Sequence, residues 1–332
     1  MKIVIATPLF PPHIGGPALY AELFSRTWKA AGHEVTVVSS DSLRNMPSGI
    51  RHFLYACKLL PSIFRADVVY VLDTFSVAIP TTILCHILKK KIIVRVGGDF
   101  LWESYVNRTY EAVFLSEFYT EERNFTFKEN TIFDLTNFVF AYADKIVFST
   151  NWQKDIYLDA YTLDTAKVHV VENLYMQRTK RNIVPKNRVV LSPARDIFLK
   201  NKKGLEEAFK NLKERFFDAT LDTSTSTHEE LLSRISEAYC VVVPSFSEVS
   251  PNLVLDAISL GVPVVVTMDC GIKDRLGDSV LWVNPKDPQS IQEGIETLMD
   301  ARTYSEYMTR MSKFAFERGE EVVARDFLIL GS

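Results

Sequence analysis

The sequence predicts an α/β protein with two doubly wound parallel sheets. Short apolar runs alternate with segments of helical periodicity through most of the 332 residues, a pattern typical of parallel strands joined by crossover helices. A charged stretch that contains Pro185, residues 177–188, interrupts this alternation and has the composition of a linker. A chain of this length can build two domains, each with a core of its own.

In the first half, the predicted strands are residues 2–8, 34–40, 67–73, 92–96, 144–150 and 167–173. Helices are expected at 18–31, at 51–64, from the third strand to about residue 88, within 105–143, and between the last two strands, where Ser149 or Thr150 could cap the start. The loop after the first strand contains Gly15 and Gly16 but lacks G-x-G-x-x-G. A dinucleotide-binding oxidoreductase is therefore disfavoured, and a tight turn is the simplest explanation of the two glycines.

The second half repeats the alternation. Strands are predicted at residues 189–195, 240–244, 263–267 and 279–284, and helices at 205–217, 228–238, 289–300, 305–318 and 320–330. Between the strands 240–244 and 263–267, apolar residues recur at helical spacing up to Gly261, which ends that helix. Pro251 is placed in its first turn, where a missing N–H costs nothing.

Composition narrows the class of protein. With 47% apolar and 24% charged residues, the chain has the composition of a soluble globular protein, and its net charge of −3 gives no general attraction to nucleic acid. The four cysteines lack metal or redox spacing. No signal peptide or membrane-spanning segment is evident, so we expect a cytoplasmic protein. Peripheral contact at the inner face of the membrane stays open, because helix 51–64 carries basic and apolar residues; a core-facing helix is favoured there.

The helix after Pro251 creates an anion site. Its first backbone N–H groups have no partner within the helix, and the positive end of its dipole points to the carboxyl end of a parallel strand. Glu248 stands just before this helix and Asp256 inside it, with seven residues between them.

Residues 244–265 resemble the signature of retaining nucleotide-sugar glycosyltransferases of family four, which have the GT-B fold. That signature is P-S-x-x-E-x-x-P-N-x-x-x-E-A-x-x-x-G-x-P-V-V, and Asp256 replaces its second glutamate. The resemblance implies two Rossmann-like domains facing a cleft. They are an acceptor-side domain at 1–176 and, after the linker 177–188, a nucleotide-sugar domain at 189–304, with helices at 305–332 that cross back to the first domain.

The resemblance also implies roles for particular residues. Glu248 contacts the donor sugar, Asp256 the ribose, and Arg195 and Lys203 grip the diphosphate. The other donor-binding positions that it implies are Gly15, Gly16, Asn173, Ser250, Pro251, Asn252 and Leu253. Asp99 could position or deprotonate the acceptor hydroxyl, or equally cap the next helix; Gly98 stands where many relatives have a histidine.

The activity implied is transfer of a sugar from a nucleoside-diphosphate donor to a hydroxyl of a glycan or lipid-linked acceptor, with retention of configuration, in cell-surface polysaccharide or glycolipid synthesis. No cofactor is expected, and the absence of Asp-x-Asp favours a metal-free mechanism. Residues 217–227 lead so directly into the helix 228–238 that roughly one strand–helix unit of the family is expected to be missing, which leaves the nucleotide base open. Two alternatives remain: a GT-B sugar-nucleotide epimerase or hydrolase, and a non-catalytic sugar-nucleotide-binding subunit.

Overall fold

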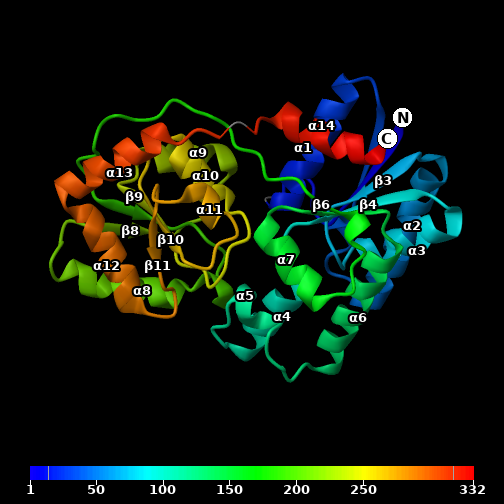
Figure 1. Ribbon diagram of the computed structural model, residues 1–332, viewed down its shortest axis with the longest axis horizontal. Coiled ribbons are helices and arrows are strands. Elements are labelled where there is room, and N and C mark those ends of the chain that lie inside the picture. The colour runs from blue at the N-terminus through cyan, green and yellow to red at the C-terminus, as the bar shows by residue number, and fades with distance from the viewer. Residues whose placement is uncertain (14, 317) are drawn as a thin grey trace. The chain divides into compact units, whose positions relative to one another are not determined.

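The computed structural model describes residues 1–13, 15–316 and 318–332. It contains a six-stranded and a five-stranded sheet, both parallel, with helices between the strands (Figure 1). The predicted α/β class with two doubly wound sheets is confirmed. Contacts divide the chain into two compact units. The first unit comprises residues 1–104, 122–174 and 320–332, and the second comprises residues 105–121 and 175–319.

The first unit is built on the sheet with the order β2-β1-β3-β4-β5-β6. Its strands are β1 (Lys2–Thr7), β2 (Glu34–Ser39), β3 (Val68–Val71), β4 (Lys91–Val96), β5 (Lys145–Phe148) and β6 (Val168–Val170). The order reverses at β1, which lies between β2 and β3. Such a reversal leaves a crevice at the carboxyl ends of the strands, where open α/β sheets bind ligands.

The helices of the first unit come from the segments between its strands and from the end of the described chain. They are α1 (Gly16–Ala30), η1 (Asp41–Leu43), α2 (Ser48–Arg65), α3 (Ala78–Leu88), α6 (Phe127–Tyr142), α7 (Asn151–Ala160), η2 (Thr165–Lys167) and α14 (Glu320–Gly331). Helix α4 (Phe100–Thr109) begins in this unit and ends among residues of the second. Of the two predicted caps for α7, Thr150 accepts a hydrogen bond from the Gln153 backbone N–H.

The last helix of the chain completes the core of the first unit. The Trp28 indole donates to the Ala324 carbonyl at 2.9 Å, and the Tyr70 hydroxyl donates to the Phe327 carbonyl at 2.9 Å. The Phe327 ring lies 4.8 Å from that of Phe24. Figure 1 shows α14 beside α1. Because the buried face of α1 is aromatic, it needs this apolar cover.

The second unit is built on the sheet with the order β11-β10-β9-β7-β8. Its strands are β7 (Val189–Leu191), β8 (Thr220–Asp222), β9 (Cys240–Val243), β10 (Val264–Thr267) and β11 (Leu281–Val283). Its helices are α5 (Leu115–Phe118), η3 (Phe198–Lys200), α8 (Lys202–Lys213), α9 (His228–Glu237), α10 (Asn252–Ser259), α11 (Lys273–Leu276), α12 (Pro288–Met299) and α13 (Ala301–Lys313).

The structure differs from the predicted elements at several points. Strand β8 lies in a segment where the sequence analysis placed no strand, and β7 ends at Leu191 rather than residue 195. Pro251 is the N-cap of α10 and precedes its first turn. Gly261 ends α10 as expected, with a φ of +73° that favours glycine.

The residue ranges of the two compact units also differ from the predicted domain boundaries. Residues 105–121, which the sequence predicts in the first domain, belong to the second unit. Of the two last helices, α13 belongs to the second unit, and only α14 belongs to the first.

We predict that Phe327→Ala destabilises the protein by about 3–5 kcal/mol, because it removes a fully buried ring from the α1–α14 core. The matched control is Ile329→Ala on the same helix. Its side chain is 61% exposed, so the free energy of unfolding should change by no more than about 0.5 kcal/mol. Chemical denaturation monitored by tryptophan fluorescence measures both; equal effects of the two variants would contradict this role of α14.

Candidate functional site

A cavity of about 280 Å³ lies in the second unit, where β7 and β9 end and α10 begins. This is the carboxyl edge of a parallel sheet, at which such folds bind their ligands. Its charged lining residues are Arg195, Lys200 and Glu248. The remaining lining residues end β9, follow β7 or β9, or lie at the start of α10: Ser192, Pro193, Ala194, Val242, Val243, Pro244, Ser245, Pro251, Asn252 and Leu253.

The start of α10 faces this cavity. Pro251, its N-cap, makes no side-chain hydrogen bond to the helix, and Asn252 and Leu253, which line the cavity, are the first two residues of the helix. Their backbone N–H groups are among those that an α-helix cannot satisfy internally. The positive end of the helix dipole therefore adds to the charge of Arg195 and Lys200, and the three together favour an anion such as a diphosphate.

Lys200 and Glu248 form an ion pair across the cavity wall. The Lys200 ammonium lies 2.6 Å from the Glu248 carboxylate, and the two side chains are only 22% and 15% exposed. Lys200 ends the short helix η3, which is held by packing of the Phe198 ring 5.1 Å from that of Phe246. The Phe246 N–H also donates to the Leu199 carbonyl at 3.0 Å.

The cation of this cavity differs from the one that the resemblance indicated. Lys203 lies in the first turn of α8 with an exposed side chain and is outside the lining of the cavity. Asn201, in the left-handed conformation with a φ of 52°, separates η3 from α8. Among the described residues that line the cavity, Lys200, which stands before this turn, is the lysine present. Spacing alone could not show this, because both lysines stand shortly before Gly204.

Backbone pairing anchors Glu248 to the turn after β10. Its N–H donates to the Asp269 carbonyl at 3.0 Å, and its carbonyl accepts from the Gly271 N–H at 2.8 Å. Glu248 and Cys270 therefore form a parallel bridge. The loop between β9 and α10 is thus tied to the next strand's end at the residue that carries the carboxylate.

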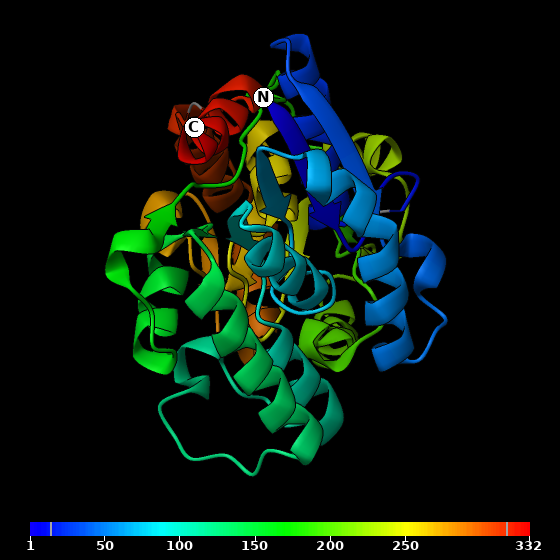
Figure 2. The same ribbon diagram turned by 90° about the vertical axis from the view of Figure 1, so that its right-hand side faces the viewer.

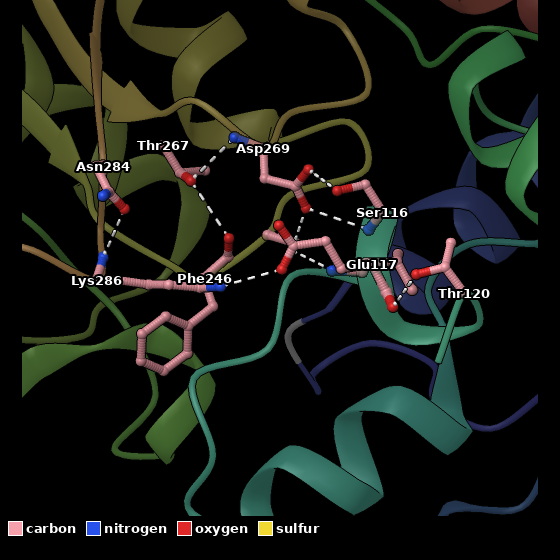
Figure 3. A network of polar contacts seen from close by, with 10 residues as sticks. Ser116, Glu117, Thr120, Phe246, Thr267, Asp269, Asn284 and Lys286 are labelled. Atoms are coloured by element: carbon pink, nitrogen blue, oxygen red, sulfur yellow. Dashed lines mark hydrogen bonds and ion pairs between the residues drawn. The ribbon is translucent and has the colours of Figure 1, made fainter. Parts of the chain in front are cut away.

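A buried carboxylate, Asp269, reinforces this arrangement (Figure 3). The Ser116 hydroxyl donates to Asp269 Oδ1 at 2.5 Å, and the Ser247 hydroxyl donates to Oδ2. The Leu115 N–H in turn donates to Ser247 Oγ at 2.7 Å. A segment from the N-terminal half of the chain is therefore bonded directly to the loop that carries Glu248.

The same segment is fastened at a second point. The Lys286 ammonium lies 3.1 Å from the Glu117 carboxylate and 3.8 Å from the centre of the Phe114 ring, and Figure 3 shows Lys286 and Glu117 beside the Asp269 cluster. Further along, the Tyr110 ring packs on Phe198, next to Lys200. Residues 105–121 thus contact the loops of both Lys200 and Glu248. No sequence pattern predicts these contacts, because the segment is expected in the first domain.

Asp256 is engaged by two neighbours. Its carboxylate lies 3.0 Å from His228 Nε2 and 3.6 Å from Arg178 Nη2. The hydrogen bond to Asp256 raises the pKa of His228 above its usual value of 6.5, although partial burial works against this. Asp256 and Ser250 belong to the same unit as the cavity but are outside its described lining.

The remaining predicted site residues lie in the first unit. Asp99 is buried, and its carboxylate accepts from the Trp102 N–H at 2.8 Å, so it caps α4. Asn173 accepts a 2.7 Å bond from Arg95, whose buried guanidinium lies 3.8 Å from the centre of the Tyr20 ring. The first-loop glycines start α1: Gly15 is its N-cap and Gly16 its first residue.

In the part of the chain that the structure describes, no group of three or more His, Cys, Asp or Glu side chains could hold a metal ion. None of the helices described in residues 1–13, 15–316 and 318–332 has both the length and the apolar content needed to span a bilayer.

Comparison with known proteins identifies the fold. Residues 219–318 match the family described as Glycosyl transferases group 1. A curated relative, the uncharacterized glycosyltransferase MJ1607 of Methanocaldococcus jannaschii, is 33% identical over 75 residues, which cover 22% of this chain and 19% of the relative. The chain thus matches about a fifth of that relative's length.

Solved structures resemble nearly the whole chain. Anabaena Alr3699/HepE in complex with UDP superposes with a TM-score of 0.66 at 12% identity, covering 99% of both chains. Sucrose-phosphate synthase from Thermosynechococcus elongatus has a TM-score of 0.70 at 15% identity, covering 99% of this chain and 97% of that one. The fold is therefore that of the GT-B glycosyltransferases, and the match over 219–318 supports a glycosyltransferase.

We predict that the His228–Asp256 pair stabilises the folded protein at acid pH and not at alkaline pH. A histidine whose folded pKa is raised contributes its stability below the unfolded value of 6.5 and loses it as the pH rises through the raised value. His228→Gln should therefore lower the melting temperature at about pH 5.5 more than at about pH 9. The difference should correspond to less than about 1 kcal/mol, because the side chain is half exposed.

The control is Asp256→Asn. In this background, His228→Gln should lose its pH dependence, since the partner that raises the pKa is gone. A stability loss that is the same at both pH values would show that the pair contributes packing rather than charge.

Proposed function

We propose that this chain is a retaining glycosyltransferase that moves a sugar from a nucleoside-diphosphate donor to a hydroxyl of a glycan or lipid-linked acceptor. The observation that carries the proposal is the cavity of the second unit, where Arg195, Lys200 and the start of α10 converge beside Glu248. Two cations and a helix N-terminus suit a diphosphate, and a carboxylate next to them suits the sugar that the diphosphate carries.

In this proposal the protein stabilises the leaving group. When the bond from the sugar to the phosphate breaks, negative charge develops on the diphosphate. Arg195 and the backbone N–H groups of Asn252 and Leu253 would bind that charge without reorganisation. Lys200 would exchange its bond to Glu248 for one to phosphate. Protein cations then do what a divalent ion does in other transferases, so we propose a metal-independent reaction without a cofactor.

Glu248 has the catalytic role in the proposal. Its carboxylate accepts hydrogen bonds from hydroxyls of the donor sugar, and its charge favours the positive charge that develops at the reacting carbon. The departing phosphate takes the proton of the acceptor hydroxyl on the same face of the sugar, which retains the configuration. The anchoring of the Glu248 backbone at Asp269 and Gly271 supports this role, because electrostatic catalysis needs a fixed group.

The other predicted site residues have separate proposed roles. Asp256 is proposed as the ribose contact, and the ribose hydroxyls would then share its carboxylate with His228. Asn173, Gly15 and Gly16 are proposed to contact the donor from the first unit. For Asp99 the hydrogen bond to the Trp102 N–H favours a cap of α4 over a catalytic role.

We further propose that the reaction belongs to cell-surface polysaccharide or glycolipid synthesis in the cytoplasm, with peripheral contact at the membrane. A lipid-linked acceptor would be presented at a bilayer surface. A second candidate function is a sugar-nucleotide epimerase or hydrolase, because a putative UDP-N-acetylglucosamine 2-epimerase from Listeria monocytogenes has a similar fold, with a TM-score of 0.62 at 15% identity over 99% of this chain and 95% of that one. The third reading is a non-catalytic binding subunit.

We predict that Arg195→Ala and Lys200→Ala each weaken binding of UDP about tenfold or more, whereas Lys203→Ala leaves it nearly unchanged. A charge-assisted hydrogen bond contributes about 1.5–3 kcal/mol, and Lys203 is outside the cavity. Titration calorimetry on the three purified variants compares them directly. Weaker binding by Lys203→Ala together with unchanged binding by Lys200→Ala would show that Lys203, and not Lys200, binds the diphosphate.

The proposed activity is tested by incubating the protein with UDP-sugars, with and without lipid-linked acceptors, in the presence of EDTA. A transferase should consume the donor only with an acceptor, should retain the anomeric configuration by NMR, and should work without a divalent ion. Glu248→Gln should mainly lower kcat, while the exposed Glu207→Gln should not. Turnover without an acceptor would indicate the epimerase or hydrolase. Binding without any turnover would indicate the non-catalytic subunit, and recovery on adding magnesium would refute metal independence.

A further inference from the structure

Helix α2 exposes a continuous apolar stripe to solvent. Its outward side chains recur at spacings of three and four residues, so they lie on one face of the helix. Phe53 and Phe64 are 68% and 69% exposed, and Ile50 is 54% exposed. Leu54 and Leu60 are also exposed. This stripe consists of Ile50, Phe53, Leu54, Cys57, Leu60 and Phe64.

The core of the first unit does not account for this stripe. Tyr55, Leu59 and Ile63 are fully buried and form the opposite face of the same helix. A helix at the surface of a globular protein normally has one apolar and one polar face, but α2 is apolar on both. Helix α3, which packs beside it (Figures 1 and 2), adds Ile83 and Ile87, two exposed side chains one turn apart. Exposed apolar patches of this kind mark interaction surfaces.

Basic side chains border the stripe along one edge. Arg51, Lys58 and Arg65 are spaced by seven residues, which places them in a line along the helix, about 60–100° from Ile50 at about 100° per residue. Arg44 stands seven residues before Arg51, in the turn that precedes α2. No aspartate or glutamate occurs between Asp41 and Asp67. The surface therefore combines apolar side chains with basic ones, to which the segment itself offers no carboxylate, although the whole chain has a net charge of −3. The Lys58 ammonium donates to the Ser39 carbonyl at 2.8 Å, which leaves its charge without an acidic partner in this bond.

We propose that α2 docks on the surface of an anionic lipid bilayer. Phe53, Phe64 and Ile50 would enter the boundary between headgroups and acyl chains, and the basic edge would contact the lipid phosphates. A second copy of the chain fits this surface less well, because the same segment offers no carboxylate to the basic residues. Docking would bring the protein to the surface where a lipid-linked acceptor lies. This consequence rests on the proposed function, whereas the docking itself does not.

Cys57 makes the docking directly measurable. It belongs to the outward stripe, while Cys85, Cys240 and Cys270 are buried. An environment-sensitive fluorophore attached to Cys57 should become brighter and shift to the blue with vesicles of phosphatidylcholine and phosphatidylglycerol, and not with phosphatidylcholine alone. Flotation of the unlabelled full chain should likewise be stronger with the anionic vesicles than with phosphatidylcholine alone. It should be weaker at high salt than at low salt, because salt screens the basic edge.

Substitutions then assign the contact to α2. Phe53→Ser and Phe64→Ser should each weaken vesicle partitioning roughly tenfold, and Lys58→Gln with Arg65→Gln by roughly fivefold or more. The matched control is Phe217→Ser, since Phe217 is 84% exposed in the second unit. It should leave partitioning unchanged, and all variants should keep the melting temperature of the parent.

Three results would overturn the proposal. The first is failure to float with anionic vesicles at low salt. The second is an equal loss of partitioning for Phe217→Ser and Phe53→Ser. The third is a dimer by light scattering that Phe53→Ser dissociates, which would make a second copy the occupant. None of these measurements uses donor or acceptor. A failed test of sugar transfer would therefore leave the docking result unchanged, and a failed docking test would leave the transfer result unchanged.

Discussion

The parallel pairing of β9 with β10 determines where Glu248 and the start of α10 lie. It brings the loop after β9 and the turn after β10 to the same edge of the sheet, so that Glu248 pairs with Asp269 and Gly271 through its backbone. The helix that joins the two strands must then start at this edge, with its N-terminus towards the cavity. The start of α10 and the Glu248 carboxylate are close together because one crossover supplies both, whereas Arg195 and Lys200 come from the segment that follows β7.

Charge balance at this edge is local and incomplete. Glu248 neutralises Lys200, whereas Arg195 and the start of α10 add further positive potential to the same cavity. A ligand that carries two negative charges would compensate the charge of Arg195 and the positive end of α10. It would also compete with Glu248 for Lys200. Asp256, one helical turn further along α10, is balanced separately by His228 and Arg178. The two carboxylates of the motif therefore have distinct electrostatic surroundings in spite of their fixed spacing.

Segments distant in sequence complete both units. Helix α14 supplies the missing apolar cover for α1 in the first unit, and residues 105–121 tie the loops of Lys200 and Glu248 in the second. These contacts depend on single side chains such as Ser116. No sequence pattern shows which residue its hydroxyl will bond. Both segments could be predicted as helical, but their destinations could not.

The sequence by itself determined the two doubly wound sheets, most strand and helix positions, and the placement of Glu248 just before helix α10, because apolar periodicity and the Pro251–Gly261 boundaries are local properties. Tertiary structure decided which lysine enters the cavity, since the left-handed turn at Asn201 separates Lys200 from Lys203. It also decided that Asp99 caps α4, that β8 forms, and that α2 has an unused apolar face. Each of these depends on which neighbours cover a side chain, and such neighbours come from elsewhere in the chain.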